Sequence, residues 1–186
     1  MLTDQAKQAI REQMARYPVS RSALGPALYI AQQECGGWVP PEAVRDVAEV
    51  MGLEPADVQS TMSFYVMYNK APVGKYMIEI CHNISCAVLG CSRLFEVVEQ
   101  KCGIRQGETS EDGMFTLKGV ECLAACEGAP VLQLNGLYHE NVTPEQLETL
   151  IDRLRAEAGI PESIYNAVYT PERTPRSGNG AANGSG

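Results

Sequence analysis

The sequence predicts an α+β protein in which a bundle of short helices precedes a domain of alternating strands and helices. Through roughly the first 70 residues, apolar side chains recur three and four positions apart, which is typical of amphipathic helices. Beyond Pro72 and Gly74 they alternate as in strands, and helical spacing returns between the strands. Hydrophobic residues make up 45% of the 186 residues, which is ample for a packed core.

Four helices are expected before this boundary, at residues 4–16, 22–35, 40–51 and 55–66. The second helix has one apolar face, which is made by Leu24, Leu28, Ala31 and Cys35. Glycines after the second and third helices end them, and prolines in the first turn begin the third and fourth. Because helices of this length bury little surface alone, residues 1–72 are expected to form a small bundle.

Residues 73–160 are expected to form a second domain with the element order β-α-β-β-β-α. Its first three elements are a strand, a helix and a strand, at residues 75–80, 87–101 and 114–120. A hairpin follows, with a type I′ turn at Asn135-Gly136, and Thr143 begins the last helix with a capping box. This order is the thioredoxin-like arrangement, although the sequence lacks the C-x-x-C motif of dithiol exchange.

Composition excludes several classes of protein. The net charge of −8 argues against binding to the phosphate backbone of a nucleic acid. The sequence shows neither a signal peptide nor an apolar run long enough for direct membrane insertion. Seven cysteines cannot all pair as disulfides, and clustered cysteines in a reducing cytoplasm indicate metal or redox chemistry. The last segment, residues 161–186, ends in a run rich in Gly, Ser, Asn and Ala and is expected to be a flexible tail.

Two short cysteine pairs are the most informative pattern in the chain. Cys81-x4-Cys86 and Cys122-x3-Cys126 each stand in a loop-like stretch directly after an expected strand. Thiolates are soft ligands, so a set of four cysteine sulfurs indicates zinc or an iron–sulfur cluster. The residues therefore predict a metal centre held by two loops.

Spacing alone leaves three interpretations open: ordinary buried thiols, structural zinc and an iron–sulfur cluster. Two close pairs, each after a strand, would be a coincidence among ordinary thiols, and zinc sites more commonly use C-x2-C pairs. Four thiolates bind either a [2Fe–2S] or a [4Fe–4S] core. The division into two and two favours a dinuclear core in which each pair binds one iron.

The remaining cysteines and both histidines are not expected to be ligands. Cys91 would lie inside a helix and pack in the core, and Cys35 and Cys102 are expected to be small buried hydrophobes. His82 and His139 lack the spacing of Rieske-type ligation, in which histidine replaces cysteine on one iron. The predicted ligand set therefore contains cysteine alone.

Nucleotide-binding motifs are absent from the sequence, which has no G-x-G-x-x-G after a strand and no Walker A loop. Pyridine-nucleotide chemistry would therefore need another chain to bind the nucleotide, and no catalytic residue is expected in this one. The aromatic cluster of Phe64, Tyr65 and Tyr68 is expected to be mostly core, with a partner interface as the second possibility.

Four stretches carry a resemblance to a known family: SFYVMYNKAPVGKY, CHNISC, CLAACEGAPVLQLNG and YHENVTPEQLETLIDRL. Over about residues 10–158, the chain resembles the small thioredoxin-like [2Fe–2S] subunit of NADH:quinone oxidoreductase, respiratory complex I. The resemblance implies one [2Fe–2S] cluster, ligated by Cys81, Cys86, Cys122 and Cys126. Two features depart from the family pattern, namely the cysteine at position 91 and the Gly-rich C-terminal extension.

The resemblance also implies a partner and a role. The helical N-terminal part would dock on the large subunit that binds FMN and NADH, and the cluster would exchange one electron with that flavin. The isolated chain would have no turnover, and the complex would hold it on the cytoplasmic side of a membrane. Similar small subunits occur in NAD-linked formate dehydrogenases and hydrogenases. A free-standing ferredoxin of thioredoxin fold and a zinc-stabilised interaction module are further alternatives.

Overall fold

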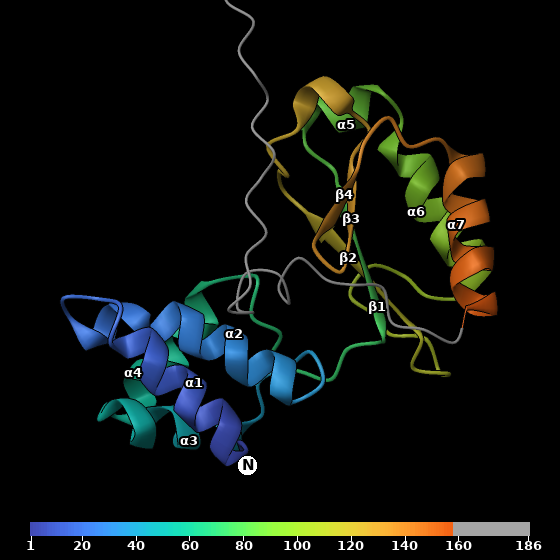
Figure 1. Ribbon diagram of the computed structural model, residues 1–186. Helices are drawn as coiled ribbons and strands as arrows, with labels where there is room; N and C mark the ends of the chain where they lie inside the picture. Colours follow the sequence, from blue (N-terminus) through green and yellow to red (C-terminus); the bar gives the residue numbers. More distant parts are fainter. Residues whose placement is uncertain (158–186) are drawn as a thin grey trace, which may run out of the picture.

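The computed structural model describes residues 1–157, so the tail expected at 161–186 lies outside the described residues (Figure 1). Within the described range, no helix has the length and apolar character needed to cross a membrane. The first half contains α1 (Asp4–Met14), the 3-10 helix η1 (Ser20–Ala23), α2 (Leu24–Glu34), α3 (Pro41–Met51) and α4 (Pro55–Phe64). The second half contains β1 (Tyr76–Cys81), α5 (Ile84–Val88), α6 (Cys91–Cys102), β2 (Phe115–Val120), η2 (Cys126–Gly128), β3 (Leu132–Leu134), β4 (Leu137–His139) and α7 (Pro144–Ala156). The α+β prediction is confirmed.

Helices α1–α4 form the bundle that the apolar spacing predicts. Their inward side chains make one hydrophobic cluster, whose fully buried members include Ile10, Leu28 and Val39. Thr3 caps α1, because its hydroxyl accepts a hydrogen bond from the Ala6 N–H at 3.2 Å. Gly52 ends α3 with a φ of 65°, a left-handed conformation that costs glycine little.

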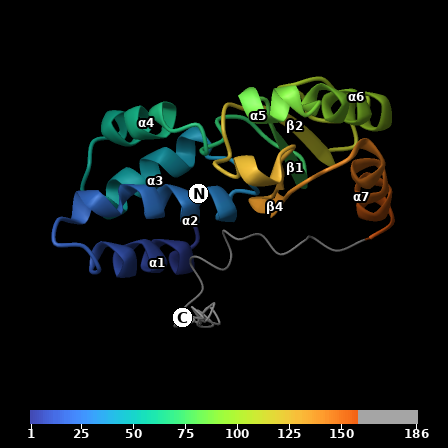
Figure 2. The ribbon, with the colours of Figure 1, turned by 90° about the horizontal axis from the view of Figure 1, so that it is seen from above.

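The second half is built on a four-stranded sheet with the order β2-β1-β3-β4. β1 and β2 are parallel, whereas β3 is antiparallel to both β1 and β4. Helices α5 and α6 lie between the two parallel strands in the chain, and α6 packs beside α7 on the side of the sheet that faces away from the bundle (Figures 1 and 2). The core between sheet and helices includes Ile78, Leu94, Leu117 and Leu147.

The prediction of a single helix at 87–101 is wrong, because the chain forms two helices in this region. α5 ends at Val88 and α6 begins at Cys91, and Gly90 between them has a φ of 88°. L side chains rarely adopt this left-handed backbone, so glycine permits the change of direction. Cys91 therefore stands in the first turn of α6 and not in the middle of a helix.

The hairpin turn and the cap of the last helix are confirmed. Asn135 and Gly136 have φ angles of 48° and 81°, and a type I′ turn requires both to be positive. Asn135 also ties the hairpin to β1, because its side-chain carbonyl accepts a hydrogen bond from the Met77 N–H at 2.7 Å. Thr143 and Gln146 form the reciprocal capping box at the start of α7.

The segment between α4 and β1 joins the bundle to the sheet and is held from both sides. The buried amide of Gln32, on α2, donates to the Met67 carbonyl at 3.2 Å and accepts from the Asn69 N–H at 2.7 Å. On the sheet side, the Gly74 N–H donates to the Thr116 hydroxyl at 2.6 Å. The connection is therefore an ordered segment with polar contacts to both halves.

Candidate metal centre

Two neighbouring parallel strands bring the cysteine loops to one edge of the sheet. Cys81 is the last residue of β1 and pairs with Val120, the last residue of β2. Cys122 follows two residues later, and the Cys81 thiol contacts the Glu121 carbonyl oxygen at 3.8 Å. The carboxyl ends of parallel strands share one edge, so strand pairing itself joins the two loops. This edge, with α5 and η2, lies at the top of Figure 1.

The first pair, Cys81 and Cys86, is buried, with 3% and 2% of each residue exposed. Asn83 begins α5, because its side chain accepts a hydrogen bond from the Ile84 N–H at 2.7 Å. This short helix places Cys86 near enough to Cys81 for that thiol to affect its ionisation. Burial, with a smaller contribution from Cys81, raises the pKa of the Cys86 thiol to about 11. Binding of a metal at this pair therefore has to displace protons.

The second pair, Cys122 and Cys126, is exposed. Between them the backbone turns through Ala124, which has a φ of 56°. The Ala124 N–H donates to the Cys122 sulfur at 3.3 Å, and Cys126 begins η2. Backbone N–H groups that point at cysteine sulfur are among the contacts that tune iron–sulfur centres.

The donor set fits an iron–sulfur cluster. Four cysteine sulfurs lie in two pairs on adjacent loops, and one already accepts a backbone hydrogen bond. Nowhere in residues 1–157 do three or more His, Cys, Asp or Glu side chains converge as ligands of a single metal ion. A dinuclear core needs two thiolates on each of its two irons, which is the division that the loops provide. The assignment of all four cysteines as ligands stays a prediction.

A further buried cysteine lies next to the first pair. Cys91 is 4% exposed and belongs to the same hydrophobic cluster as Cys81 and Cys86. Burial raises the pKa of its thiol, and Cys81 adds to the increase. Its expected packing in the core is confirmed. The helix break at Gly90 brings it beside the predicted ligands.

The two other cysteines differ from expectation, since Cys35 and Cys102 are half-buried rather than buried.

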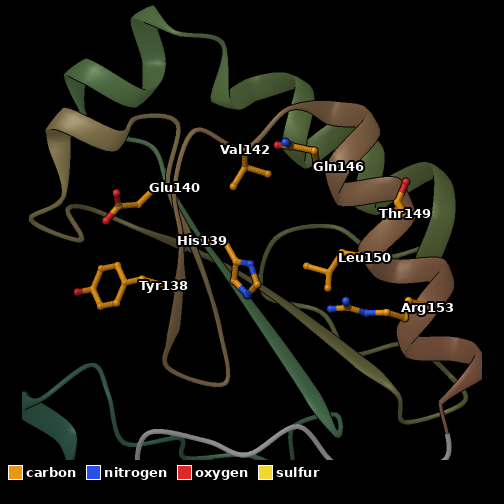
Figure 3. Close-up of a pocket in the computed structure, with 8 residues that line it drawn as sticks. All are labelled: Tyr138, His139, Glu140, Val142, Gln146, Thr149, Leu150 and Arg153. Atoms are coloured by element: carbon orange, nitrogen blue, oxygen red, sulfur yellow. The ribbon is translucent and has the colours of Figure 1, made fainter. Parts of the chain in front are cut away.

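His139 lines a hollow of about 530 Å³ between β4 and α7 (Figure 3). Figure 3 shows its ring beside Leu150 and Arg153 of α7, and no described residue that lines the hollow is a cysteine. Burial and the neighbouring Arg153 lower the pKa of His139, which favours its neutral form.

An exposed apolar rim beside the first cysteine pair was missed in the sequence. Ile84, Val88 and Leu89 are 76%, 80% and 58% exposed, and we call these three residues the α5 rim. A helix this short can bury only one face, and α5 buries the face that holds Cys86. The signal was present, because the run ISCAVL is apolar almost throughout.

The aromatic cluster at the end of α4 is only partly core. Tyr68 is 4% exposed, and its hydroxyl donates to the Gly25 carbonyl at 3.0 Å. Phe64 and Tyr65 are 78% and 46% exposed. α4 ends at Phe64, earlier than expected, and Tyr65 adopts an extended conformation outside the helix.

Comparison with known proteins decides the family of this chain. The sequence model of the family described as thioredoxin-like [2Fe-2S] ferredoxin matches residues 10–155. The chain belongs to this family. The thioredoxin-like [2Fe–2S] ferredoxin domain expected from the strand order and the cysteine pairs is thereby confirmed.

Relatives of this ferredoxin-family chain extend over most of its length. It is 41% identical to an NADH-quinone oxidoreductase subunit of the E type from Rhizobium meliloti over 165 residues, which are 89% of this chain and 97% of that protein. It is 38% identical to NADH-quinone oxidoreductase subunit 2 of Thermus thermophilus, over 86% of this chain and 89% of that protein. The resemblance noted in the sequence is confirmed.

Solved structures share the fold at lower identity. The crystal structure of an NAD+-reducing [NiFe]-hydrogenase in the H2-reduced state superposes with a TM-score of 0.63 and 18% identity. The match covers 74% of this chain and 23% of that chain. At this identity the likeness supports the fold alone, and this ferredoxin-family chain corresponds to about a quarter of the larger chain.

Proposed function

We propose that this chain is the iron–sulfur electron-transfer subunit of the NADH dehydrogenase module of an NADH:quinone oxidoreductase. The observation that carries the proposal is the pair of cysteine loops at one sheet edge, in a chain that matches 97% of an NADH-quinone oxidoreductase subunit at 41% identity. The chain by itself has no turnover, because the nucleotide and the flavin bind to a partner.

Four thiolates of this chain would hold one [2Fe–2S] cluster: Cys81, Cys86, Cys122 and Cys126. When bound, such a cluster supplies a centre that gains and loses one electron. Cys81 and Cys86 anchor it from the buried side, where water is excluded. Cys122 and Cys126 hold it on the exposed side, and the Ala124 N–H stabilises the negative charge on one sulfur.

The partner that we propose is the large subunit that binds FMN and NADH. The α5 rim supports this part of the proposal, because it exposes three aliphatic side chains next to the cysteine pairs. Apolar residues in the centre of an interface exclude water and favour association. A centre that exchanges electrons also has to approach the flavin closely. The helical residues 1–72 add a second docking region, and residues 73–160 hold the cluster.

Membership of such a complex would hold the chain on the cytoplasmic side of a membrane. An equivalent subunit of a hydrogenase or formate dehydrogenase would use the same cluster but co-purify with a different set of chains. A free-standing ferredoxin would purify without a partner.

Anaerobic purification followed by reduction with dithionite tests the proposal. Low-temperature EPR should show a near-stoichiometric rhombic S = 1/2 signal that is absent before reduction, and metal analysis should give two irons per chain. A tagged chain should also retain a flavoprotein from its own host. Zinc without iron would contradict the proposal and favour a structural interaction module.

A further inference from the structure

A largely buried ion pair joins β1 to the edge strand β2, two residues before the strand ends that carry the cysteine loops. Glu79 of β1 and Lys118 of β2 are register partners, and their charged atoms lie 3.5 Å apart. The Glu79 side chain is 10% exposed and the Lys118 side chain 27% exposed. A pair so shielded from water interacts more strongly with nearby charges than a surface pair does.

The position of the Lys118 ammonium is fixed by a second contact. It donates a hydrogen bond to the Val66 carbonyl at 2.6 Å, across 52 positions of sequence. Val66 belongs to the segment that joins the bundle to the sheet. The positive charge is therefore held in place by a strand neighbour and by the connecting segment.

This ion pair lies on the same strand face as the first predicted ligand. Side chains alternate along a strand, so Glu79 and Cys81 share one face of β1, about 7 Å apart along the strand. Lys118 has the same relation to Val120, the register partner of Cys81. Glu79 and Lys118, one negative and one positive, are thus each two residues before the strand ends that carry the predicted cluster.

We propose that Glu79 and Lys118 each act on the reduction potential of the cluster, with opposite sign, so that the intact pair is a compensated charge beside Cys81. The inference rests on the proposed function. The gain of one electron makes the centre more negative by one charge. A nearby ammonium stabilises that state, and a nearby carboxylate opposes it. In the intact pair the two effects nearly cancel, so removal of either partner should shift the potential, in opposite directions.

Redox titration of the full-length anaerobic protein, followed by EPR, tests this inference. Lys118→Met should lower the midpoint potential, and Glu79→Gln should raise it. Each variant should change the ratio of reduced to oxidised cluster at a fixed potential by about tenfold. For a one-electron centre, this corresponds to a shift of the midpoint potential by about 59 mV. The double variant should return close to the wild-type potential. Unchanged g-values would show that the ligands are the same.

A matched control uses the ion pair between Lys101 and Asp152, at 2.8 Å between α6 and α7. Lys101→Met removes the same charge about 15 Å along α6 from Cys91 and should leave the potential unchanged. Should Lys118→Met fail to fold, Glu79→Gln and the double variant carry the test. If Lys118→Met and Glu79→Gln shifted the midpoint potential in the same direction, or if Glu79→Gln did not shift it, the inference would be overturned. A wild-type chain without a reducible cluster would instead contradict the proposed function.

Discussion

Each predicted ligand cysteine occupies a position that only the fold explains. Cys81 and Cys86 are almost completely buried, whereas Cys122 and Cys126 are exposed. A cluster bound between such pairs has a protected side and an accessible side. This asymmetry suits a centre that must be stable and must also exchange electrons with a partner.

Removal of one exposed ligand should disrupt the cluster. In Cys122→Ala, one iron loses one of its two thiolates, so the anaerobic protein should lose most of its visible absorption or yield a converted cluster with less iron. Iron analysis and absorption spectra of freshly purified protein provide the measurement.

Cys91→Ala is the matched control, because Cys91 is buried beside the ligands without being one of them in our assignment. Its spectrum should equal that of the wild-type protein. A bleached Cys91→Ala protein together with a coloured Cys86→Ala protein would show that the ligand assignment is wrong.

At the residue scale, the sequence predicts which two cysteines of each loop act together as ligands, but it does not predict the surroundings of Cys91. The pairs are visible because ligand spacing within one loop is local. The placement of Cys91 depends on the helix break at Gly90, where a φ of 88° changes the direction of the chain. A helical pattern that continues across a single glycine does not reveal that break.

At the scale of elements, α5 combines a ligand with the exposed α5 rim. Val88→Glu places a charge on the rim without touching Cys86, so the cluster spectrum should be unchanged. Association with the flavin subunit should weaken by about tenfold or more, because a charge at the centre of an apolar interface has to be desolvated. Titration of the purified flavin subunit against each variant gives the dissociation constants.

Gln100→Glu, on the exposed face of α6, is the control for added negative charge and should bind as the wild-type chain does. Equal affinities of the Val88→Glu and wild-type proteins would show that the rim is not part of the interface.

The half-buried position of His139, on β4 beside the hollow that α7 also lines, predicts a pH effect on folding stability. The pKa of His139 is lowered in the folded state by burial and Arg153, so the unfolded chain binds its proton more readily. Folding stability should therefore decrease as the pH falls below about 6.5, where the unfolded imidazole becomes protonated. His139→Gln should remove part of this pH dependence below 6.5 and leave the pH dependence near pH 8 unchanged, as measured by urea denaturation. Identical pH profiles for both proteins would contradict the prediction.

At the scale of the whole molecule, the segment between α4 and β1 decides how the bundle meets the sheet. Gln32 is 6% exposed and bonds two backbone groups of this segment, the Met67 carbonyl and the Asn69 N–H. Gln32→Met leaves the buried Asn69 N–H and the partly buried Met67 carbonyl without this partner. The expected loss of stability is about 2–3 kcal/mol, since each unsatisfied buried group costs about 1–3 kcal/mol.

Hydrogen exchange measures the local part of that effect. The Asn69 N–H should exchange much faster in Gln32→Met than in the wild-type protein, while amides of β1 should remain protected. Gln59→Met, on the exposed side of α4, is the control and should change neither quantity. Unaltered protection of Asn69 in the Gln32 variant would show that other contacts hold the segment.

Local patterns in the chain are enough to predict the α+β class, the approximate helices and strands, the hairpin turn, the α7 cap and the two cysteine pairs. All of these depend on residues a few positions apart, where apolar spacing, capping side chains and turn residues act directly. Which pair is buried, where Cys91 lies, which side chains the α5 rim exposes and which charges meet across β1 and β2 all depend on long-range packing. Glu79 and Lys118 are 39 positions apart and meet only because β1 and β2 pair in parallel register. Such a pairing depends on the packing of the whole sheet, which no local pattern encodes.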